Sequence, residues 1–436
     1  MKNKNLPNSP NAARCATLIP MVRVYLNHLQ NFSSNVKIFL AGNAIQGIGL
    51  SIYGLLFNIY LKELGFGESS IGSLISTTSL GISLMAIPAA LIIEKFHMKH
   101  LVVTGMFLSS VFYFFQILHT DASSLFAFGL LASMFQALFN ISISPFYLRN
   151  STPQMRMHLF SLNSALSMLA QLVGYLVGGY LPEMVRFVSP ELSSVEVYRS
   201  SIMVSLMIVF LSNVLFIRIK KVPIPRVKKP ILSDIKDRDW KLLSKLILPK
   251  LCFAFGGGLI VPFINLYLKE KFHFSTKMVG ISYATLQLFI FMGIFITPTL
   301  AKKTTNLRFI LMTSLFSIPF MVTMGLTGNI GLVLSCFFLR GMLMNMSSPI
   351  TSMFEMERVR ESECVFASAI ILFFYHLVYT SSTRIGGFMI EEYSFGPTFY
   401  VAAAFYGAAI ILYHRFFKHE EIKKEVTEVA DTQKAA

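Results

Sequence analysis

The chain has 436 residues, of which 54% are hydrophobic and 14% are charged. A soluble domain carries about a quarter charged residues, so this composition excludes a soluble enzyme. The net charge of +16 is compatible with an anionic partner such as nucleic acid, and where the basic residues lie decides whether it indicates one.

Apolar runs fill most of the chain between Ile38 and Phe417, and the charges cluster in short islands between them. Each run is about 18 to 25 residues long, which as a helix crosses a hydrocarbon core of about 30 Å. We therefore predict an all-α membrane protein with twelve transmembrane helices. The predicted spans are 38–61, 70–93, 101–119, 124–147, 159–182, 200–217, 247–268, 279–300, 309–327, 330–354, 364–390 and 395–416.

Lysines and arginines are unequally divided between the two sides that these spans define. Thirty of the 38 fall in the N-terminal region, in alternate loops and in the C-terminal tail. Cytoplasmic loops carry the excess of Lys and Arg, so both termini are expected in the cytoplasm and the protein in the inner or plasma membrane of a cell. The positive charge therefore indicates topology, and we expect no nucleic-acid partner. The six basic residues on the other side are Lys62, Arg186, Arg199, Lys269, Lys271 and Lys277.

An internal repeat divides the chain into two similar halves. The sequence Asn-Ile-Tyr-Leu-Lys-Glu at 58–63 recurs as Asn-Leu-Tyr-Leu-Lys-Glu at 265–270, 207 positions later. Parallel repeats of this kind are typical of transporters whose halves move about a central site. Further matches at offsets of 204 to 208 are Gly178-Gly179 with Gly386-Gly387, Asn140 with Asn345, and Pro145 with Pro349.

The repeat gives a domain organisation with two six-helix bundles. The basic segment 218–246 contains the longest polar interior stretch and reads as a linker. The bundles are predicted at 38–217 and 247–416, between a cytoplasmic N-terminal region at 1–37 and a cytoplasmic tail at 417–436.

With this duplication and linker, the chain resembles the major facilitator superfamily over its whole length. The loop at 90–99 is similar to the family signature at Glu94, Lys95 and Lys99, although Ala90 and His97 stand where glycines are usual. The segment from Arg340 to Pro349 looks like the tenth span of bacterial members grouped with efflux proteins. The resemblance implies two pseudo-symmetric bundles, with Glu94 and Lys95 acting in gating at the cytoplasmic side.

Polar side chains in the first, fourth, seventh and tenth spans are candidates for a central cavity. Buried polar residues in a membrane are costly, so those present usually face other helices or water. Of asparagine and glutamine, the third, sixth, ninth and twelfth spans hold only Gln116 and Asn213. The predicted cavity residues are Asn43, Gln46, Asn58, Gln136, Asn140, Asn265, Arg340 and Asn345.

Arg340 and two further residues, Arg384 and His376, each have two interpretations. The Arg340 guanidinium can hold a carboxylate or phosphate of a ligand, or it can bond neighbouring helices. Arg384 can act in gating, or it can extend toward the outer surface, as Glu391 does on the same helical face. His376 can carry a proton for coupling, or it can be a hydrogen-bonded packing residue.

The sequence therefore predicts a secondary transporter of a small molecule and not an enzyme, because no catalytic set converges in any span. Export or exchange of an amphipathic compound is the first interpretation. The alternatives are uptake or exchange of a small organic anion bound by Arg340, and a membrane sensor without transport. Coupling to H⁺ or another ion stays open. We expect a monomer in the lipid bilayer, without a cofactor or a metal site.

Overall fold

Helices make up nearly all of the chain that the structure describes. The computed structural model describes residues 32–221, 238–302, 304–360 and 363–435. Among these residues, twelve helical segments are long and apolar enough to cross a membrane, at the twelve predicted places, so the fold prediction is confirmed. The helices are α2 (Ser34–Glu63), α3 (Glu68–Lys95), α4 (Met98–Leu118), α5 (Ala122–Asn150), α6 (Pro153–Val188), α7 (Ser194–Ile217), α8 (Trp240–Ile260), η2 (Val261–Phe263), α9 (Ile264–Phe272), α10 (Thr276–Ala301), α11 (Asn306–Leu326), α12 (Ile330–Met346), α13 (Ser348–Met356), α14 (Cys364–Tyr393) and α15 (Phe395–Ala435).

Side-chain caps determine where many of these helices begin. The Ser193 hydroxyl accepts from the backbone N–H of Glu196, whose carboxylate accepts from the Ser193 backbone. Asp239 accepts from the N–H of Leu242, so α8 begins seven residues before the predicted seventh span. Such caps satisfy N–H groups that have no partner inside the helix.

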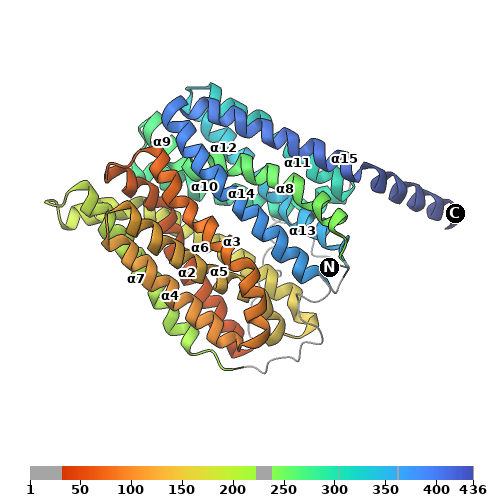
Figure 1. Ribbon diagram of the computed structural model, residues 1–436, viewed down its shortest axis with the longest axis horizontal. Helices are drawn as coiled ribbons and strands as arrows, with labels where there is room; N and C mark the ends of the chain where they lie inside the picture. Colours follow the sequence, from red (N-terminus) through yellow and green to blue (C-terminus); the bar gives the residue numbers. More distant parts are fainter. Residues whose placement is uncertain (1–31, 222–237, 303, 361–362, 436) are drawn as a thin grey trace, which may run out of the picture.

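The helices form two bundles of the same construction, seen as the warm and cool colours of Figure 1. In the first bundle α2 packs on α6 and α7, and α4 packs on α5 and α7. In the second bundle α8 packs on α14 and α15, and α11 packs on α12 and α15. Each packed pair thus has a counterpart in the other bundle, as a duplicated six-helix unit requires.

The two ends of the molecule differ in what they carry. We call the end where α2 ends and α3 begins the loop face, and the end where α2 begins the terminus-bearing face. In Figure 1 the loop face carries α9, and α15 leaves the body at the terminus-bearing face. α15 continues as helix to Ala435, through most of the predicted tail, whereas residues 1–31 and the linker centre at 222–237 lie outside the described residues.

Prolines interrupt the seventh and tenth spans. The seventh consists of α8, one turn of 3₁₀ helix containing Pro262, and α9. The tenth divides at Ser347, immediately before a helix with Pro349 in its first turn. Proline has no N–H to donate to the preceding turn, so carbonyl groups at these places are free to bond elsewhere.

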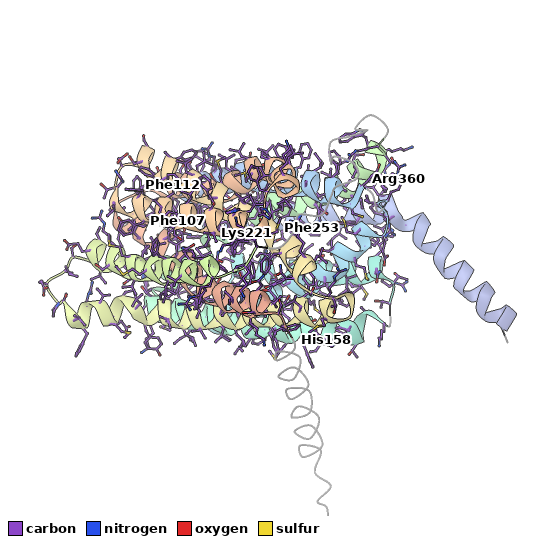
Figure 2. The ribbon with its side chains drawn as sticks, turned by 90° about the horizontal axis from the view of Figure 1, so that it is seen from below. Phe107, Phe112, His158, Lys221, Phe253 and Arg360 are labelled. Atoms are coloured by element: carbon purple, nitrogen blue, oxygen red, sulfur yellow. The ribbon has the colours of Figure 1, made fainter. Side chains whose placement is uncertain are left out.

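Apolar side chains cover the outside of the bundles. Figure 2 labels Phe107 and Phe112 on the side of the body, and Arg360 at the end from which α15 projects. Phe107 is 43% exposed, a fraction that a soluble surface would not favour but a lipid-facing surface does. Many exposed phenylalanines and methionines therefore belong to the lipid contact and carry no information on the substrate.

Candidate functional site

The two copies of the Asn-x-Tyr-Leu-Lys-Glu repeat meet at the loop face. The Asn58 Nδ2 donates to Asn265 Oδ1 (3.1 Å) and to the carbonyl oxygen of Pro262 (2.6 Å). The Asn265 Nδ2 donates to the carbonyl oxygen of Leu55 (3.1 Å). Leu55 and Pro262 are also 207 positions apart, so each asparagine bonds the carbonyl three residues before the other. Such mutual contacts are those of an isologous, two-fold interface.

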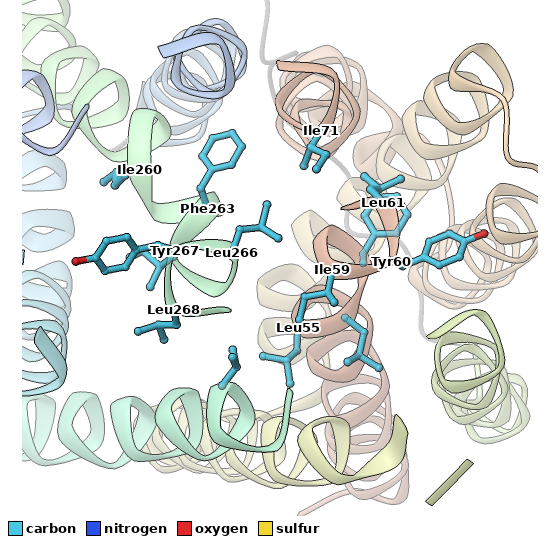
Figure 3. Close-up of a cluster of buried hydrophobic side chains, with 14 of the residues drawn as sticks. Leu55, Ile59, Tyr60, Leu61, Ile71, Ile260, Phe263, Leu266, Tyr267 and Leu268 are labelled. Carbon is cyan, nitrogen blue, oxygen red and sulfur yellow. The ribbon is translucent and has the colours of Figure 1, made fainter. Parts of the chain in front are cut away.

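Hydrophobic residues from both bundles surround these amides. Figure 3 shows Leu55 and Ile59 of α2 facing Phe263 and Leu266 of the second bundle. All four side chains are at most 1% exposed. Water is therefore excluded from the amide pair, which strengthens its hydrogen bonds.

Two ion pairs between the bundles show the same reciprocal pattern as the asparagines, about one helical turn closer to the end of α2. Lys62 Nζ lies 3.3 Å from a Glu270 carboxylate oxygen, and Lys269 Nζ lies 2.8 Å from a Glu63 oxygen. Since Lys62 corresponds to Lys269 and Glu63 to Glu270, these pairs are counterparts. Lys62 also pairs with Glu68 at the start of α3.

Two more hydrogen bonds join the bundles at this face. The Glu391 carboxylate accepts from the backbone N–H of Ser69 (2.7 Å), in the first turn of α3. A carboxylate at a helix N-terminus is favoured by the helix dipole and by the unpaired N–H groups there. The hydroxyls of Tyr198 and Thr276 are 2.6 Å apart. The loop face is thus closed by contacts from both bundles.

Below this face the bundles touch at two glycine pairs. α3 packs on α14 at Gly72 and Gly387, and α10 packs on α6 at Gly280 and Gly179. A Cβ on Gly280 would lie 2.6 Å from the Gly179 Cα, so only glycine permits this approach. Small residues let membrane helices pack closely. Gly280 lies 208 positions after Gly72, and Gly387 lies 208 positions after Gly179, so the two contacts are counterparts in the repeat.

Two polar contacts of the described chain join the bundles at greater depth. Gln287 Nε2 of α10 donates to Gln171 Oε1 of α6 (2.5 Å), next to the Tyr175 and Tyr283 rings, which lie 5.2 Å apart at a tilt of 56°. Ser83 of α3 donates to the Phe373 carbonyl of α14 (2.9 Å). Such bonds are few in the described chain, so the contact between the two bundles below the loop face depends mainly on the shape complementarity of the packed helices.

A cavity of about 460 Å³ lies in the second bundle, in the half toward the terminus-bearing face, where α13 ends and α14 begins. Its wall runs from Ser368 in the first turns of α14 to His376, about 12 Å deeper along the helix. This volume is typical of small-molecule sites. The cavity is lined by Lys250, Phe253, Ile310, Ser314, Met344, Ser347, Ser348, Thr351, Ser352, Glu355, Met356, Ser368, Ile371, Leu372, Tyr375, His376 and Tyr413.

An ion pair lies in the wall of this cavity. Lys250 Nζ of α8 is 2.7 Å from Glu355 Oε2 of α13, and Tyr413 of α15 donates to Glu355 Oε1 (3.3 Å). The Glu355 side chain is 3% exposed, whereas that of Lys250 is 23% exposed. Charges inside a membrane protein usually mark a substrate or ion pathway.

The predicted cavity residues are distributed over several environments. Asn58 and Asn265 lie in the loop-face closure. Asn43 donates to Asn163 Oδ1 (2.9 Å), and Gln136 donates to Asn140 (3.2 Å), both within the first bundle. Gln46 is 2% exposed, and its Oε1 accepts no bond within the described chain.

The predicted residues of the second bundle lie apart from one another. Arg340 is 5% exposed and donates to the Tyr406 hydroxyl (3.0 Å), and Asn345 donates to the Gly341 carbonyl one turn before it (2.8 Å). Of the predicted residues in this bundle, the described cavity includes His376 and excludes Arg340 and Asn345. The cavity is thus formed largely by residues that the sequence analysis did not select.

The predicted gating residues occupy both ends. The Arg384 guanidinium carbon lies 5.5 Å from the ring centre of Phe126, which joins α14 to α5 of the other bundle. Lys95 is exposed in the last turn of α3 at the terminus-bearing face. The Glu94 side chain lies outside the part of the chain that the structure describes.

Several residues that line the cavity or join the bundles are not among the candidates of the sequence analysis, although some of them carry a signal in the sequence. Lys250 was assigned to the cytoplasmic charges, yet it lies inside an apolar run and in α8. Gly72 and Gly280 are 208 positions apart, the offset of the glycine pairs that were recognised. Gln171 and Gln287 carry no repeat signal, so only packing identifies them.

Known proteins share this architecture. The family model of the Major Facilitator Superfamily matches residues 39–383. A bacterial homologue of the human lysosomal transporter Spinster, in an inward-facing and occupied conformation, superposes with a TM-score of 0.73 at 14% identity, covering 89% of this chain and 97% of that one. A variant of the nucleoside transporter NupG gives 0.71 at 12%, covering 88% and 99%.

A further solved structure is more distant in shape. A bacterial homologue of the iron transporter ferroportin, in an inward-facing state, gives a TM-score of 0.66 at 15% identity, covering 87% and 98%. No significant match was found among curated proteins. At these identities the structures establish the fold, while the family match covers well over half of the sequence. This chain belongs to the Major Facilitator Superfamily.

Proposed function

We propose that this protein exports or exchanges an amphipathic small molecule across the plasma membrane by alternating access. One observation carries the proposal: a loop face closed by reciprocal contacts coexists with a cavity in the half of the protein toward the opposite face. A transporter of this family needs such an arrangement, because the substrate site must open to only one side at a time.

The loop-face contacts have the strength expected of a reversible gate. The Lys269–Glu63 and Lys62–Glu270 pairs are partly exposed, so each contributes about 0–1 kcal/mol. A net hydrogen bond contributes about 0.5–1.5 kcal/mol. A set of this size biases the closed state by a few kcal/mol, a difference that substrate binding can reverse.

The charge distribution supports an orientation. Thirty basic residues lie on the terminal side of the spans and six on the other, so the terminus-bearing face is assigned to the cytoplasm. With this orientation, the described conformation is open to the cytoplasm. A compound would enter there and leave when the loop face opens. One chain carries both bundles, so a monomer suffices for this cycle.

The cavity wall favours an amphipathic substrate over a simple anion. Aromatic and aliphatic side chains such as Phe253, Leu372 and Tyr375 alternate with serine hydroxyls and one ion pair. Such a mixed wall accommodates an apolar body with a polar end. The Arg340 guanidinium bonds Tyr406 instead of lining this cavity, which weakens the case for an anion held by Arg340.

Reconstitution in liposomes tests the proposal. Flux of one cationic, one neutral and one anionic amphipathic dye is measured for a variant with Asn58→Cys and Asn265→Cys and with the four native cysteines replaced. A short thiol cross-linker is expected to stop dye flux, and cleavage of the linker to restore it. The single variant Asn58→Cys with the same reagent is the matched control. Flux that continues after cross-linking, or no flux of any dye, would overturn the proposal.

A further inference from the structure

We propose that the cavity of the second bundle selects zwitterionic ligands, with Lys250 binding the ligand carboxylate and Glu355 binding the ligand ammonium. This inference deepens the proposed function and rests on it, because it gives the chemical class of the polar end of the substrate. The ligands meant are small molecules with an amino group and a carboxylate on one carbon and an apolar side group.

The first support is the charge of the cavity wall. Among its seventeen described lining residues, Lys250 and Glu355 are the only members that belong to Lys, Arg, Asp or Glu. The wall therefore carries one positive and one negative charge, side by side and with a net charge of zero. His376 and the hydroxyls of Tyr375 and Tyr413 are the other titratable groups that line the cavity.

The second support is the position of the pair. Glu355 is almost fully covered and is held by two donors, Lys250 and Tyr413, while the Lys250 side chain stays partly open. A buried pair of this kind is expensive to break from one side, because the remaining charge loses its partner. A ligand with a single charge would compete for one member and leave the other member unpaired.

A zwitterion avoids this penalty. Its carboxylate can accept from the open side of the Lys250 ammonium, and its ammonium can donate to the Glu355 carboxylate, so that four charges form one alternating set. Charge-assisted hydrogen bonds of this type are the strongest that side chains make. Each charge of the ligand then faces an opposite charge of the protein, and neither Lys250 nor Glu355 loses a charged partner.

The third support is the surface around the pair. Ser348 and Ser352 of α13 are exposed and line the cavity, and their hydroxyls can donate or accept. Phe253 and Tyr375 provide aromatic surface on the same wall. The volume of about 460 Å³ exceeds what a charged head group needs and leaves room for an apolar side group.

Three probes that share one phenyl ring test the selectivity. Phenylalanine is zwitterionic, phenethylamine is cationic and 3-phenylpropionate is anionic. Binding to the purified full chain in detergent is measured by equilibrium dialysis, with protein-free micelles as the background. We expect phenylalanine to bind at least about tenfold more tightly than either singly charged probe, which is a difference that dialysis resolves. Equal or weaker binding of phenylalanine would overturn the inference.

Two variants supply an opposite change in selectivity that a folding defect cannot imitate. Glu355→Gln leaves Lys250 alone and is expected to shift the preference to 3-phenylpropionate. Lys250→Met leaves Glu355 alone and is expected to shift it to phenethylamine. Glu363→Gln removes an exposed ion pair with Arg360, outside the cavity, and should keep the wild-type order. An unchanged order in both Glu355→Gln and Lys250→Met would contradict the inference. If one of these variants does not fold, the binding order of the wild-type protein decides.

The outcome is separable from that of the proposed function. If dyes are transported and the cross-link stops them, but phenylalanine has no advantage, only the zwitterion inference fails. If phenylalanine binds with the expected selectivity and no compound crosses the liposome membrane, the transport proposal fails while the site remains.

Discussion

Asn58 and Asn265 occupy the same position in two copies of one motif, and they bond each other at the closed end of the protein. Each amide also donates to the carbonyl that precedes the other asparagine by three residues. The same exchange holds for Lys62 with Glu270 and for Lys269 with Glu63. A repeat that binds its own duplicate closes the loop face with a pseudo-two-fold set of contacts.

Removal of either asparagine amide should weaken this closure to a similar degree. Asn58→Ala and Asn265→Ala each break bonds in the same buried set, so each is expected to destabilise the closed state by about 1–3 kcal/mol. The distance between spin labels on the first and second bundles at the loop face reports the population that opens. The double variant should destabilise the closed state by less than the sum of the two single variants, since the two amides share a hydrogen bond. Strict additivity would contradict the reciprocal set.

Charge reversal at Lys62 should open the loop face, and a second reversal should close it again. Lys62→Glu brings like charges together at Glu270 and Glu68, whereas Lys62→Glu with Glu270→Lys restores the cross-bundle pair. We expect rescue to be partial, because Glu68 loses its partner. The label distance is compared at low and high salt, since the contribution of a partly exposed pair of about 0–1 kcal/mol is screened by ions. A closed loop face in the single variant would show that the pair has no role.

A side chain at a glycine crossing should prevent closure. Gly280→Val places a branched side chain where a Cβ alone already lies 2.6 Å from Gly179. We expect α10 and α6 to separate and dye flux to fall at least about tenfold, because packed interfaces do not deform continuously. Gly407→Ala is the matched control, since a Cβ there meets nothing within 4 Å. Equal dye flux in the Gly280 variant and the control would show that close packing at this glycine pair is not needed for transport.

Substitution of Arg340 should separate packing from ligand binding. Arg340 is buried and bonds Tyr406, so Arg340→Gln is expected to change dye flux by less than about twofold. Glutamine keeps a side-chain amide that can donate to the Tyr406 hydroxyl, so the buried contact is retained in kind. Tyr406→Phe removes only the partner hydroxyl and serves as the comparison. Collapse of anionic dye flux in the Arg340 variant alone would instead assign Arg340 to the substrate.

Local patterns predict the membrane helices and the repeat, but they do not identify most of the residues that line the described cavity. Apolar run length gave twelve spans close to their observed positions, because insertion in a bilayer depends on each segment by itself. The same reasoning placed Lys250 among the loop charges, since a basic residue near a span end usually stays outside. Its partner Glu355 is 105 positions away, and no periodicity connects the two.

The sequence by itself determined the twelve membrane helices, the duplication and the motif that occurs twice, because hydropathy and self-similarity are properties of the chain read in order. Only the tertiary structure decided that the two motif copies bond each other and that Lys250 meets Glu355. Those contacts depend on how each helix is rotated about its axis and where two helices cross. Rotation and crossing are set by the packing of all neighbours together, which no single segment encodes.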